Sequence, residues 1–446
     1  MPLLITLIAI ISLVLLISYF RVHVFLAFLA VSLGAGVALG IPPTKIISSV
    51  QKGLGDTLGS IVYIIALGAM LGKLVANSGA IDRISQTLIQ FFGPKNMRWA
   101  FLTIGFIVGL PLFYSVGFIL LAPIAITVAT RNKMAAIYIG FPLITSLSVT
   151  QGFLPPHPAP LLLVQQLGAN MGKTLFLGII ISIPAIILGG MLFGETVKQI
   201  VRLPNPAFVA KELKPEEMPS IFVSFFSVLL PVILIALSSI IEMVFPINSS
   251  SQSNLFNQCN QWFSFLGNPV VSMFLSVLFA IYFLGIRRGK KFSELTSQLT
   301  DSIKEVAMLF LIFGGAGSLK QILVDGGVSN MIAEMMSHSS LHPFILGWLM
   351  AAFIRVAVGS STVAGITTAG FFVPVVQSTG VDPNLMVLSI GAGSMMFAHV
   401  NDTGFWLFKE YFQLSIKEII RSYSIMETII STAGLLGVLC LNYLMY

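Results

Sequence analysis

A histidine, an asparagine and an aspartate stand together near the end of a long apolar segment. They are His399, Asn401 and Asp402, within the string GAGSMMFAHVNDTGFW. A carboxylate near the centre of a bilayer costs roughly 2.5–3.5 kcal/mol, so such a group usually faces a protein interior or a water-filled cavity. The string therefore indicates a path for a polar solute. Asn401 is a candidate reader of substrate hydroxyl groups, and Asp402, with His399 beside it, is a candidate for proton coupling.

A structural role for Asp402 stays open. Aspartate and asparagine are favoured at the position just before a helix, where the side chain accepts a hydrogen bond from the first helical turn. Asp402 fits that position because a new apolar segment follows it. Capping alone does not explain the neighbouring His399 and Asn401, so the functional interpretation is preferred.

A second polar cluster lies in the string IRVAVGSSTVAG. Arg355 stands in an apolar arm, and its planar guanidinium matches the shape of a carboxylate. Ser360, Ser361 and Thr362 stand at the apparent turn, where their hydroxyls can replace the hydration of a substrate or cation. The alternative is that Arg355 pairs with Asp402, or with backbone carbonyls, only to hold the fold.

The string GLPLFYSVGF places Tyr114 and Ser115 between a proline and a glycine. A half-helix that begins there would direct free N–H groups and a positive dipole end into the membrane centre, which suits a carboxylate. The alternative is a proline kink whose hydroxyl bonds its own backbone.

The string TQGFLPPHPAP contains Thr150, Gln151 and His157 among three prolines. Proline lacks an N–H and leaves upstream carbonyls unpaired, so this segment exposes acceptors for a polyol or an ion. His157 can carry a proton because imidazole titrates near neutral pH. A hydrogen bond from His157 to a backbone carbonyl in the break is the structural alternative.

The composition is that of a polytopic membrane protein. Of 446 residues, 56% are hydrophobic and 9% are charged, whereas a soluble domain has roughly 25% charged residues. The net charge of +7 lies in short loops between apolar runs, which is typical of cytoplasmic loops and not of a nucleic-acid surface. Cys259 and Cys440 alone make neither a disulfide framework nor a thiolate metal site.

The sequence contains little that indicates an enzyme. The chain has no H-E-x-x-H zinc motif and no G-x-S-x-G elbow. Gly53-Leu54-Gly55-Asp56 resembles the GxGD motif of intramembrane aspartyl proteases, but the sequence has no Tyr-Asp partner for it. A passive channel is a weaker alternative, because opposed hairpins favour a sealed, alternating site.

Hydrophobicity along the chain predicts an all-α membrane fold. Apolar runs of about 20 residues lie at 2–20, 24–40, 59–77, 174–194, 220–245, 268–286, 306–324 and 426–446. Four further segments, 99–130, 134–165, 343–378 and 386–408, are interrupted by Gly, Pro or hydroxyl residues. Broken backbone at membrane depth survives only where protein or a wet cavity satisfies its polar groups.

The interruptions occur twice in the same order, which predicts an internal repeat. The string GAMLGKLVANSGAID is echoed by GAGSLKQILVDGGVSN, so that Lys73 matches Lys320; both are expected to extend toward the membrane surface near helix ends. A hairpin, a broken helix and a plain span follow each string. We expect two inverted-topology repeats with re-entrant hairpins and discontinuous helices, about 10 full spans plus two hairpins.

The predicted units are an N-terminal helix pair at 1–58, a first transport repeat at 59–194, a linker with two connector helices at 195–305, and a second, inverted repeat at 306–446. Loops 195–219 and 287–305 are rich in Lys and Arg, whereas 246–266 carries no charge. The first two are therefore predicted to be cytoplasmic, and both termini to lie outside.

The chain resembles the gluconate:proton symporter family of bacterial inner-membrane permeases, within the wider ion-transporter superfamily. The strings that carry the resemblance are GAMLGKLVANSGAIDRI, FYSVGF with the following LAPI, FLPPHPAP with LGAN, IRVAVGSSTVAG and GAGSMMFAHVNDTGFW. The resemblance implies a substrate site between the hairpin tips and the broken helices, formed by Ser115, Thr150, Gln151, His157, Ser360, Ser361, Thr362, Asn401 and Asp402. Family members typically carry an acidic residue where this chain has Ser115. If that carboxylate serves coupling in those members, we expect that here coupling passes to Asp402, or that the coupling ion or the substrate differs.

These observations together predict a secondary active transporter that imports a sugar acid such as gluconate by proton symport. The alternative is a sodium-coupled carrier of a dicarboxylate, a short-chain acid or an amino acid. We expect no enzymatic activity, no bound metal and no cofactor, with H⁺ as the coupling ion and Na⁺ left open. The expected partners are a small organic anion and the lipid bilayer, with no nucleic acid; a homodimer stays open. The expected location is the bacterial inner membrane, with multiple spans.

Overall fold

The computed structural model describes residues 2–202, 213–244, 254–328, 341–399 and 402–445, and within them all regular structure is helical. Seven helices of this part are long and apolar enough to cross a membrane, or eight if the bent helix α3 counts as one span. Helices α1 (Pro2–Ser18), α2 (Val24–Ala38), α16 (Pro343–Val358) and α18 (Pro383–Gly393) are shorter. The predicted class of all-α, multi-pass membrane protein is confirmed, while the total of about ten spans stays a prediction.

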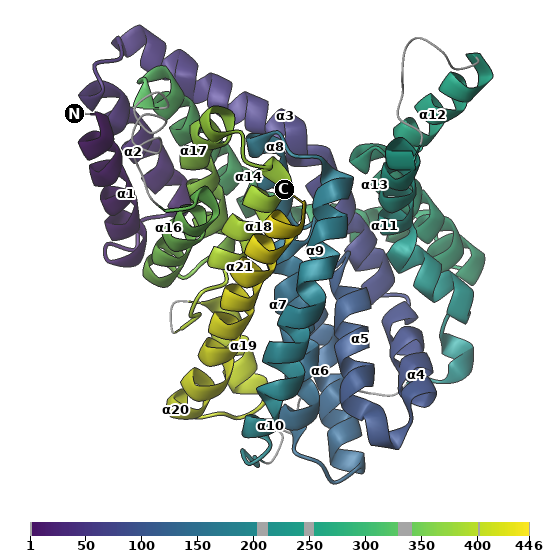
Figure 1. Ribbon diagram of the computed structural model, residues 1–446. Coiled ribbons are helices and arrows are strands. Elements are labelled where there is room, and N and C mark those ends of the chain that lie inside the picture. The colour runs from purple at the N-terminus through teal and green to yellow at the C-terminus, as the bar shows by residue number, and fades with distance from the viewer. Residues whose placement is uncertain (1, 203–212, 245–253, 329–340, 400–401, 446) are drawn as a thin grey trace.

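The helices follow the repeated order that the sequence predicts (Figure 1). The first series is α3 (Pro43–Ala76), α4 (Ala80–Phe92), α5 (Met97–Gly109), α6 (Tyr114–Arg131), α7 (Ala136–Phe153), α8 (Pro158–Leu167) and α9 (Met171–Ile186). The second is α14 (Phe292–Asp325), α16, α17 (Ser361–Thr379), α18, α19 (Thr403–Tyr411), α20 (Ile416–Ile419) and α21 (Ile425–Met445). In each series a hairpin precedes a helix that is broken in its middle.

Proline and glycine account for the interruptions. Helix α5 ends at Gly109, two residues before a proline that cannot continue it, and α7 ends at Phe153 before two prolines. Helix α16 ends at Val358, just before Gly359, whose φ of 84° is easy only for glycine. The breaks therefore have local causes that the sequence displays.

The connector between the two series lies at one side of the molecule. The end of α9 continues into η2 (Ile187–Leu192) and α10 (Gly194–Val197), and the connector helices are α11 (Ile221–Val244), α12 (Asn254–Gly267) and α13 (Pro269–Ala280). In Figure 1 helices α11 to α13 lie on the right, and α1 and α2 lie on the left. The repeated helices fill the space between them.

Helices α3 and α14 pack against each other in opposite directions. Ser49 of α3 donates a hydrogen bond to Asp325 over 2.5 Å, and farther along α3 the Lys73 ammonium lies 2.6 Å from the Glu305 carboxylate. Lys73 is thus an ion-pair partner at the helix contact, which corrects the expectation that it only extends toward the membrane surface. Both helices also cross expected unit boundaries, at 58/59 and 305/306, because each begins well before its apolar part.

Glycine allows these two helices to touch. A Cβ at Gly53 would lie 2.2 Å from the carbonyl oxygen of Gly317, and a Cβ at Gly317 would lie 2.1 Å from the Thr57 hydroxyl. Small residues let helix backbones approach closely inside membranes. The GxGD-like string is therefore part of a helix contact, and its Asp56 pairs with Lys52 on the exposed face of α3 at 2.6 Å.

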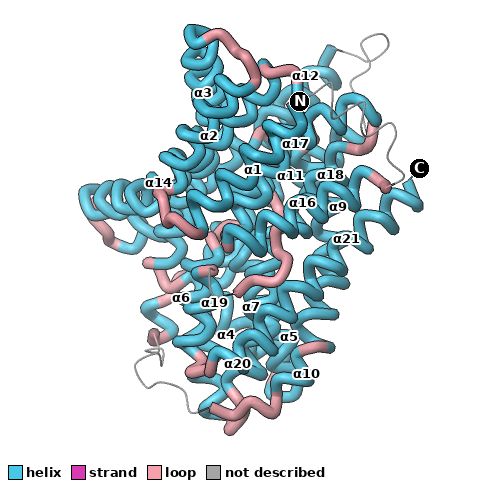
Figure 2. The backbone as a smooth tube through the Cα atoms, turned by 90° about the vertical axis from the view of Figure 1, so that its left-hand side faces the viewer, coloured by secondary structure: helices cyan, strands magenta, loops and turns pink. Residues whose placement is uncertain are grey.

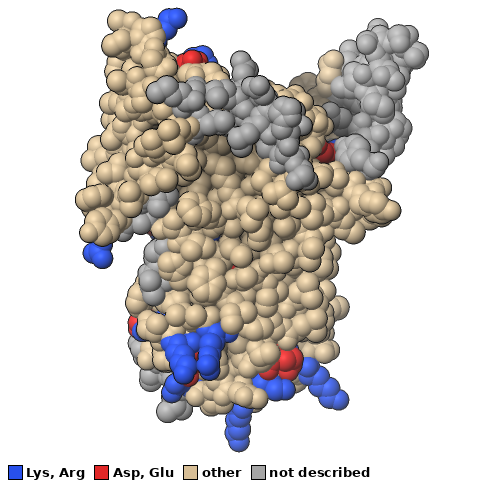
Figure 3. All heavy atoms as spheres, turned by 60° about the vertical axis from the view of Figure 1, so that its left-hand side comes forward, with Lys and Arg blue, Asp and Glu red and all other residues tan. Residues whose placement is uncertain are grey.

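Charge divides the molecule into two ends. Most Lys and Arg side chains visible in Figure 3 gather at the lower end, which carries α10 and α20 in Figure 1. There Arg202 pairs with Glu418 at 2.6 Å and so joins the start of the linker to the second repeat. Helix α1 begins and α21 ends toward the opposite end (Figures 1 and 2). The same-side placement of both termini agrees with the charge pattern; the assignment of the basic end to the cytoplasm stays a prediction.

The glycine contact gives a stability prediction. Gly53→Ala should destabilise the protein by roughly 1–3 kcal/mol, because the added methyl overlaps the α14 backbone. Gly55→Ala is the matched control, since a Cβ there meets nothing within 4 Å. Thermal unfolding of the two purified variants in detergent should show a lower midpoint for Gly53→Ala only. Equal midpoints would contradict this packing.

Candidate functional site

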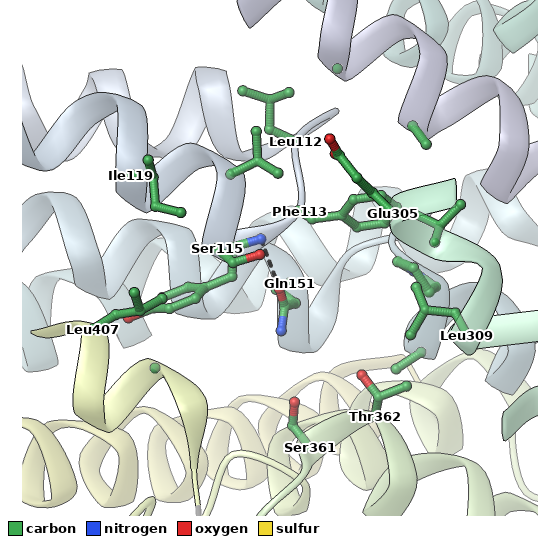
Figure 4. Close-up of a pocket in the computed structure, with 18 of the residues that line it drawn as sticks. Leu112, Phe113, Ser115, Ile119, Gln151, Glu305, Leu309, Ser361, Thr362 and Leu407 are labelled. Carbon is green, nitrogen blue, oxygen red and sulfur yellow. Dashed lines mark hydrogen bonds between the residues drawn. The ribbon is translucent and has the colours of Figure 1, made fainter. Parts of the chain in front are cut away.

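A cavity of about 800 Å³ lies where the two hairpin tips meet (Figure 4). Helices α3 and α14 form part of its wall, and α6, α7, α8 and α19 are among the elements that contribute other parts. The predicted site residues that line it are Tyr114, Ser115, Gln151, Arg355, Ser360, Ser361, Thr362 and Asp402. The structure thus brings residues from four distant motifs to one place.

The first hairpin tip is fixed to the broken helix α7. The backbone N–H of Tyr114 donates to the side-chain oxygen of Gln151 over 2.8 Å, so Gln151 satisfies one of the free N–H groups at the start of α6. The Gln151 amide nitrogen is left on the cavity side. In Figure 4 it points toward the hydroxyl of Ser361, with Ser115 close by.

The second hairpin tip faces the first across the cavity. Ser360 caps α17, where its hydroxyl accepts a hydrogen bond from the Val363 N–H over 3.3 Å. Ser361 and Thr362 form the first turn, and their hydroxyls point into the cavity (Figure 4). Neither hydroxyl bonds another described residue, so both remain available to a solute.

Four helices begin at the cavity wall. Helices α6 and α17 start at the hairpin tips, and α8 and α19 start just after the breaks, with Pro158 and Gly404 among the lining residues. Each helix N-terminus carries a partial positive charge of about +0.5, from its free N–H groups and its aligned peptide dipoles. At α19 the Asp402 carboxylate already occupies this end, and at α8 Pro158 and Pro160 lack N–H groups. The ends that favour an anion are therefore those of α6 and α17, at the two hairpin tips.

A buried ion pair joins the second tip to the second break. One Arg355 nitrogen lies 2.7 Å from Asp402 Oδ2, another donates to the Gly359 carbonyl, and the Arg355 side chain is 2% exposed. Asp402 Oδ1 accepts the N–H of Phe405 over 2.9 Å and so caps α19. Both structural alternatives raised from the sequence are therefore present at the edge of the cavity: Arg355 pairs with Asp402, and Asp402 caps a helix.

Neither histidine is among the residues that line the cavity, and each lies within the broken segment of its repeat. His157 Nε2 donates to the carbonyl of Gly109, at the end of α5, over 2.6 Å. His399 Nε2 donates to the carbonyl of Val356, near the end of α16, over 2.8 Å. Each histidine thus satisfies a carbonyl at the end of the first hairpin helix. This is the structural alternative considered for His157, and it places His399 away from the residues that line the cavity.

Two more predicted residues do not contribute to the described wall. The hydroxyl of Thr150 is buried and donates to the Leu147 carbonyl over 3.0 Å, so it serves its own helix. Asn401 lies outside the described residues.

The sequence analysis missed several polar groups in and behind the wall. Lys73 and Glu305 line the cavity as a pair, and Ser148 and Tyr423 line it from α7 and from the start of the last span. Glu427 lies behind Ser148, fully buried. The signal in the sequence that could have identified Glu427 was a carboxylate inside the apolar run 426–446, because such residues in membrane spans are usually functional.

Two hairpins and two broken helices around a cavity within a membrane-spanning helical chain define a membrane transporter. The fold matches the YdaH transporter of Alcanivorax borkumensis, with a TM-score of 0.64, 14% identity and 97% of each chain covered. It also matches MtrF of Neisseria gonorrhoeae, with a TM-score of 0.65, 13% identity, 95% of this chain and 96% of that one.

Sequence comparison gives the family. The model of the GntP family of permeases matches residues 1–444, and the chain belongs to that family. A high-affinity gluconate transporter of Escherichia coli (strain K12) is 45% identical, with 99% of each chain covered. The Gnt-II system L-idonate transporter of the same organism is 41% identical over the whole of both chains, and a gluconate permease of Bacillus subtilis (strain 168) is 39% identical over 99% of each. The predictions of the gluconate permease family and of a transporter, not an enzyme, are confirmed.

The buried ion pair gives a second stability prediction. Breaking it with Arg355→Met or Asp402→Asn should destabilise the protein by roughly 3–5 kcal/mol, because each leaves an uncompensated charge. The double variant should lose about 2 kcal/mol less than the sum of the single losses. Unfolding of the purified variants in detergent measures this coupling.

The exposed pair Lys52–Asp56 provides the control, because its side chains are 61% and 65% exposed. The same cycle there should show no measurable coupling. Additive losses at Arg355 and Asp402 would mean that the buried pair does not act as a unit.

Proposed function

We propose that this permease imports gluconate, or a closely related sugar acid, across the bacterial inner membrane together with a proton. The observation that carries the proposal is the convergence of the N-termini of α6 and α17, from the two hairpin tips, on one hydroxyl-lined cavity. Positive helix ends favour a carboxylate, and side-chain hydroxyls and amides favour a polyol. A sugar acid is a molecule with both features.

The two hairpin tips are the proposed site for the substrate carboxylate. The first-turn N–H groups of α6 and α17 approach the cavity from opposite sides, and Ser115 and Ser361 stand at these turns. The Arg355 guanidinium already binds Asp402 and Gly359. We therefore propose that Arg355 does not bind the substrate carboxylate directly, and that it contributes positive charge and holds the second hairpin tip in place.

The rest of the cavity is the proposed site for the substrate hydroxyls. The Gln151 amide nitrogen, which bonds no other residue that the structure describes, and the hydroxyls of Ser361 and Thr362 face the same space (Figure 4). A volume of about 800 Å³ lies within the range of small-molecule sites. The names of the relatives support this class, since gluconate and L-idonate are both polyhydroxy carboxylates.

Uptake by proteoliposomes tests the proposal. Labelled gluconate should accumulate against its gradient when an inward proton gradient is imposed, and not when a sodium gradient is imposed alone. Accumulation driven only by sodium would favour the sodium-coupled alternative. Equilibration without accumulation under either gradient would indicate a passive channel.

Gln151→Glu tests the role of the first tip. The new carboxylate can still accept the Tyr114 N–H, but it removes an amide donor and adds negative charge beside the proposed carboxylate site. We expect the half-saturation concentration for gluconate to rise about tenfold or more, equivalent to about 1.4 kcal/mol of binding.

Gln165→Glu is the matched control for that variant. Gln165 is exposed on α8 and is not among the residues that line the cavity. Its substitution should leave the half-saturation concentration near that of the wild type. Equal values for wild type and Gln151→Glu would remove Gln151 from the binding site.

A further inference from the structure

Glu427 is a buried carboxylate that accepts one hydrogen bond within the described part of the chain. It lies on α21, its exposure is 0%, and its Oε1 accepts the hydroxyl of Ser148 over 2.7 Å. Its second oxygen, Oε2, has no hydrogen-bond partner among the described residues. Burial of a charged carboxylate without a paired cation is costly, so such a site favours the form that carries a proton.

The charged and titratable groups around Glu427 come from four neighbouring elements. They are Arg355 of α16, Asp402 at the start of α19, Tyr114 of α6 and Tyr423 of the short π-helix η7 (Ile420–Ser424) before α21. Arg355 binds Asp402 directly, and the structure shows no ion pair between Arg355 and Glu427. The guanidinium is therefore already matched by one carboxylate, and Glu427 is a second.

The formal charges of these groups show how protonation of Glu427 would affect the binding of an anion. One guanidinium and two carboxylates sum to one negative charge when all are ionised. A bound substrate carboxylate would add another negative charge to the same buried region. A proton on Glu427 removes one, so proton binding and anion binding favour each other, and this coupling is reciprocal.

The Ser148 hydroxyl connects Glu427 to the cavity, and the same contact joins the two repeats. Ser148 lines the cavity and donates to Glu427, so its hydroxyl stands between cavity water and the carboxylate. Ser148 belongs to α7 of the first series, and Glu427 belongs to α21 of the second. A change of charge on Glu427 therefore acts on a contact between the two repeats, which must move relative to each other in alternating access.

Asp402 and His399, the candidates from the sequence, are less suited to this role. Both carboxylate oxygens of Asp402 already accept hydrogen bonds, from Arg355 and from the N–H of Phe405. His399 donates to a backbone carbonyl and does not line the described cavity. Glu427 instead combines a free oxygen with access through one hydroxyl.

We propose that Glu427 binds the coupling proton, which reaches its carboxylate from the cavity past the Ser148 hydroxyl and returns to water on the other side of the membrane. The proposal rests on proton symport as the proposed function. It assigns Asp402 to the fixed ion pair and the cap of α19.

Transport by Glu427→Gln in proteoliposomes is the first test. The amide keeps the size of the side chain but cannot cycle between charged and neutral forms. The variant should lose gluconate accumulation under a proton gradient, while gluconate counterflow without a gradient stays within about twofold of wild type. Glu410→Gln, at a half-exposed glutamate that pairs with Lys409, should behave as wild type in both assays. Accumulation at the wild-type level by Glu427→Gln would overturn the proposal.

An infrared pH titration of the purified protein without substrate is the second test. The carbonyl band of a protonated, buried carboxylic acid should appear in wild type and in Glu410→Gln and be missing from Glu427→Gln. Retention of the band in Glu427→Gln would overturn the proposal even if that variant were inactive through misfolding. Failure of the proposed function gives a different result, because wild type itself would then not accumulate gluconate under a proton gradient, whatever the infrared titration shows.

Discussion

The constraint on which this structure depends is that backbone N–H and C=O groups must find partners inside a membrane. Four helices of the described chain begin next to the central cavity, and each start leaves N–H groups without a partner inside its own helix. In hydrocarbon such groups cost several kcal/mol each, so they persist only where side chains, water or a ligand reach them. The breaks create a binding site because they leave backbone N–H groups that need a hydrogen-bond acceptor.

In both repeats, side chains form hydrogen bonds with part of the backbone that the breaks expose. His157 and His399 each bond a carbonyl at the end of the first hairpin helix. Gln151 holds the start of α6, and Asp402 holds the start of α19. The groups that remain, on the first turns of α6 and α17, face the cavity. The same contacts that stabilise the broken backbone thus leave an anion site at the centre.

Much of this architecture could be predicted from the sequence because its causes are local. Proline and glycine end the helices where the sequence places them, and the order of hairpin, broken helix and plain span appears twice. The hairpin hydroxyls and Gln151 were found because polar residues stand out in apolar segments. The sequence also raised the Arg355–Asp402 pair as an alternative, but could not decide it because the two residues meet only through folding.

What the sequence analysis missed depends on contacts between distant segments. Lys73 looked like a residue at a helix end, and its partner Glu305 lies more than two hundred positions away. Glu427 looked like one polar residue in the last span until folding placed Ser148 beside it. Helix α14 begins earlier than expected because its first turns are polar and mostly exposed, and a search for apolar runs does not detect such turns.

A structure of the permease with gluconate bound would test the central claim most directly. The account predicts gluconate in the cavity between the two hairpin tips, with its carboxylate within hydrogen-bonding distance of the first turns of α6 and α17, at Ser115 and Ser361. Its hydroxyls should lie toward Gln151 and Thr362. A carboxylate bound instead to Lys73, or gluconate bound outside this cavity, would contradict the account.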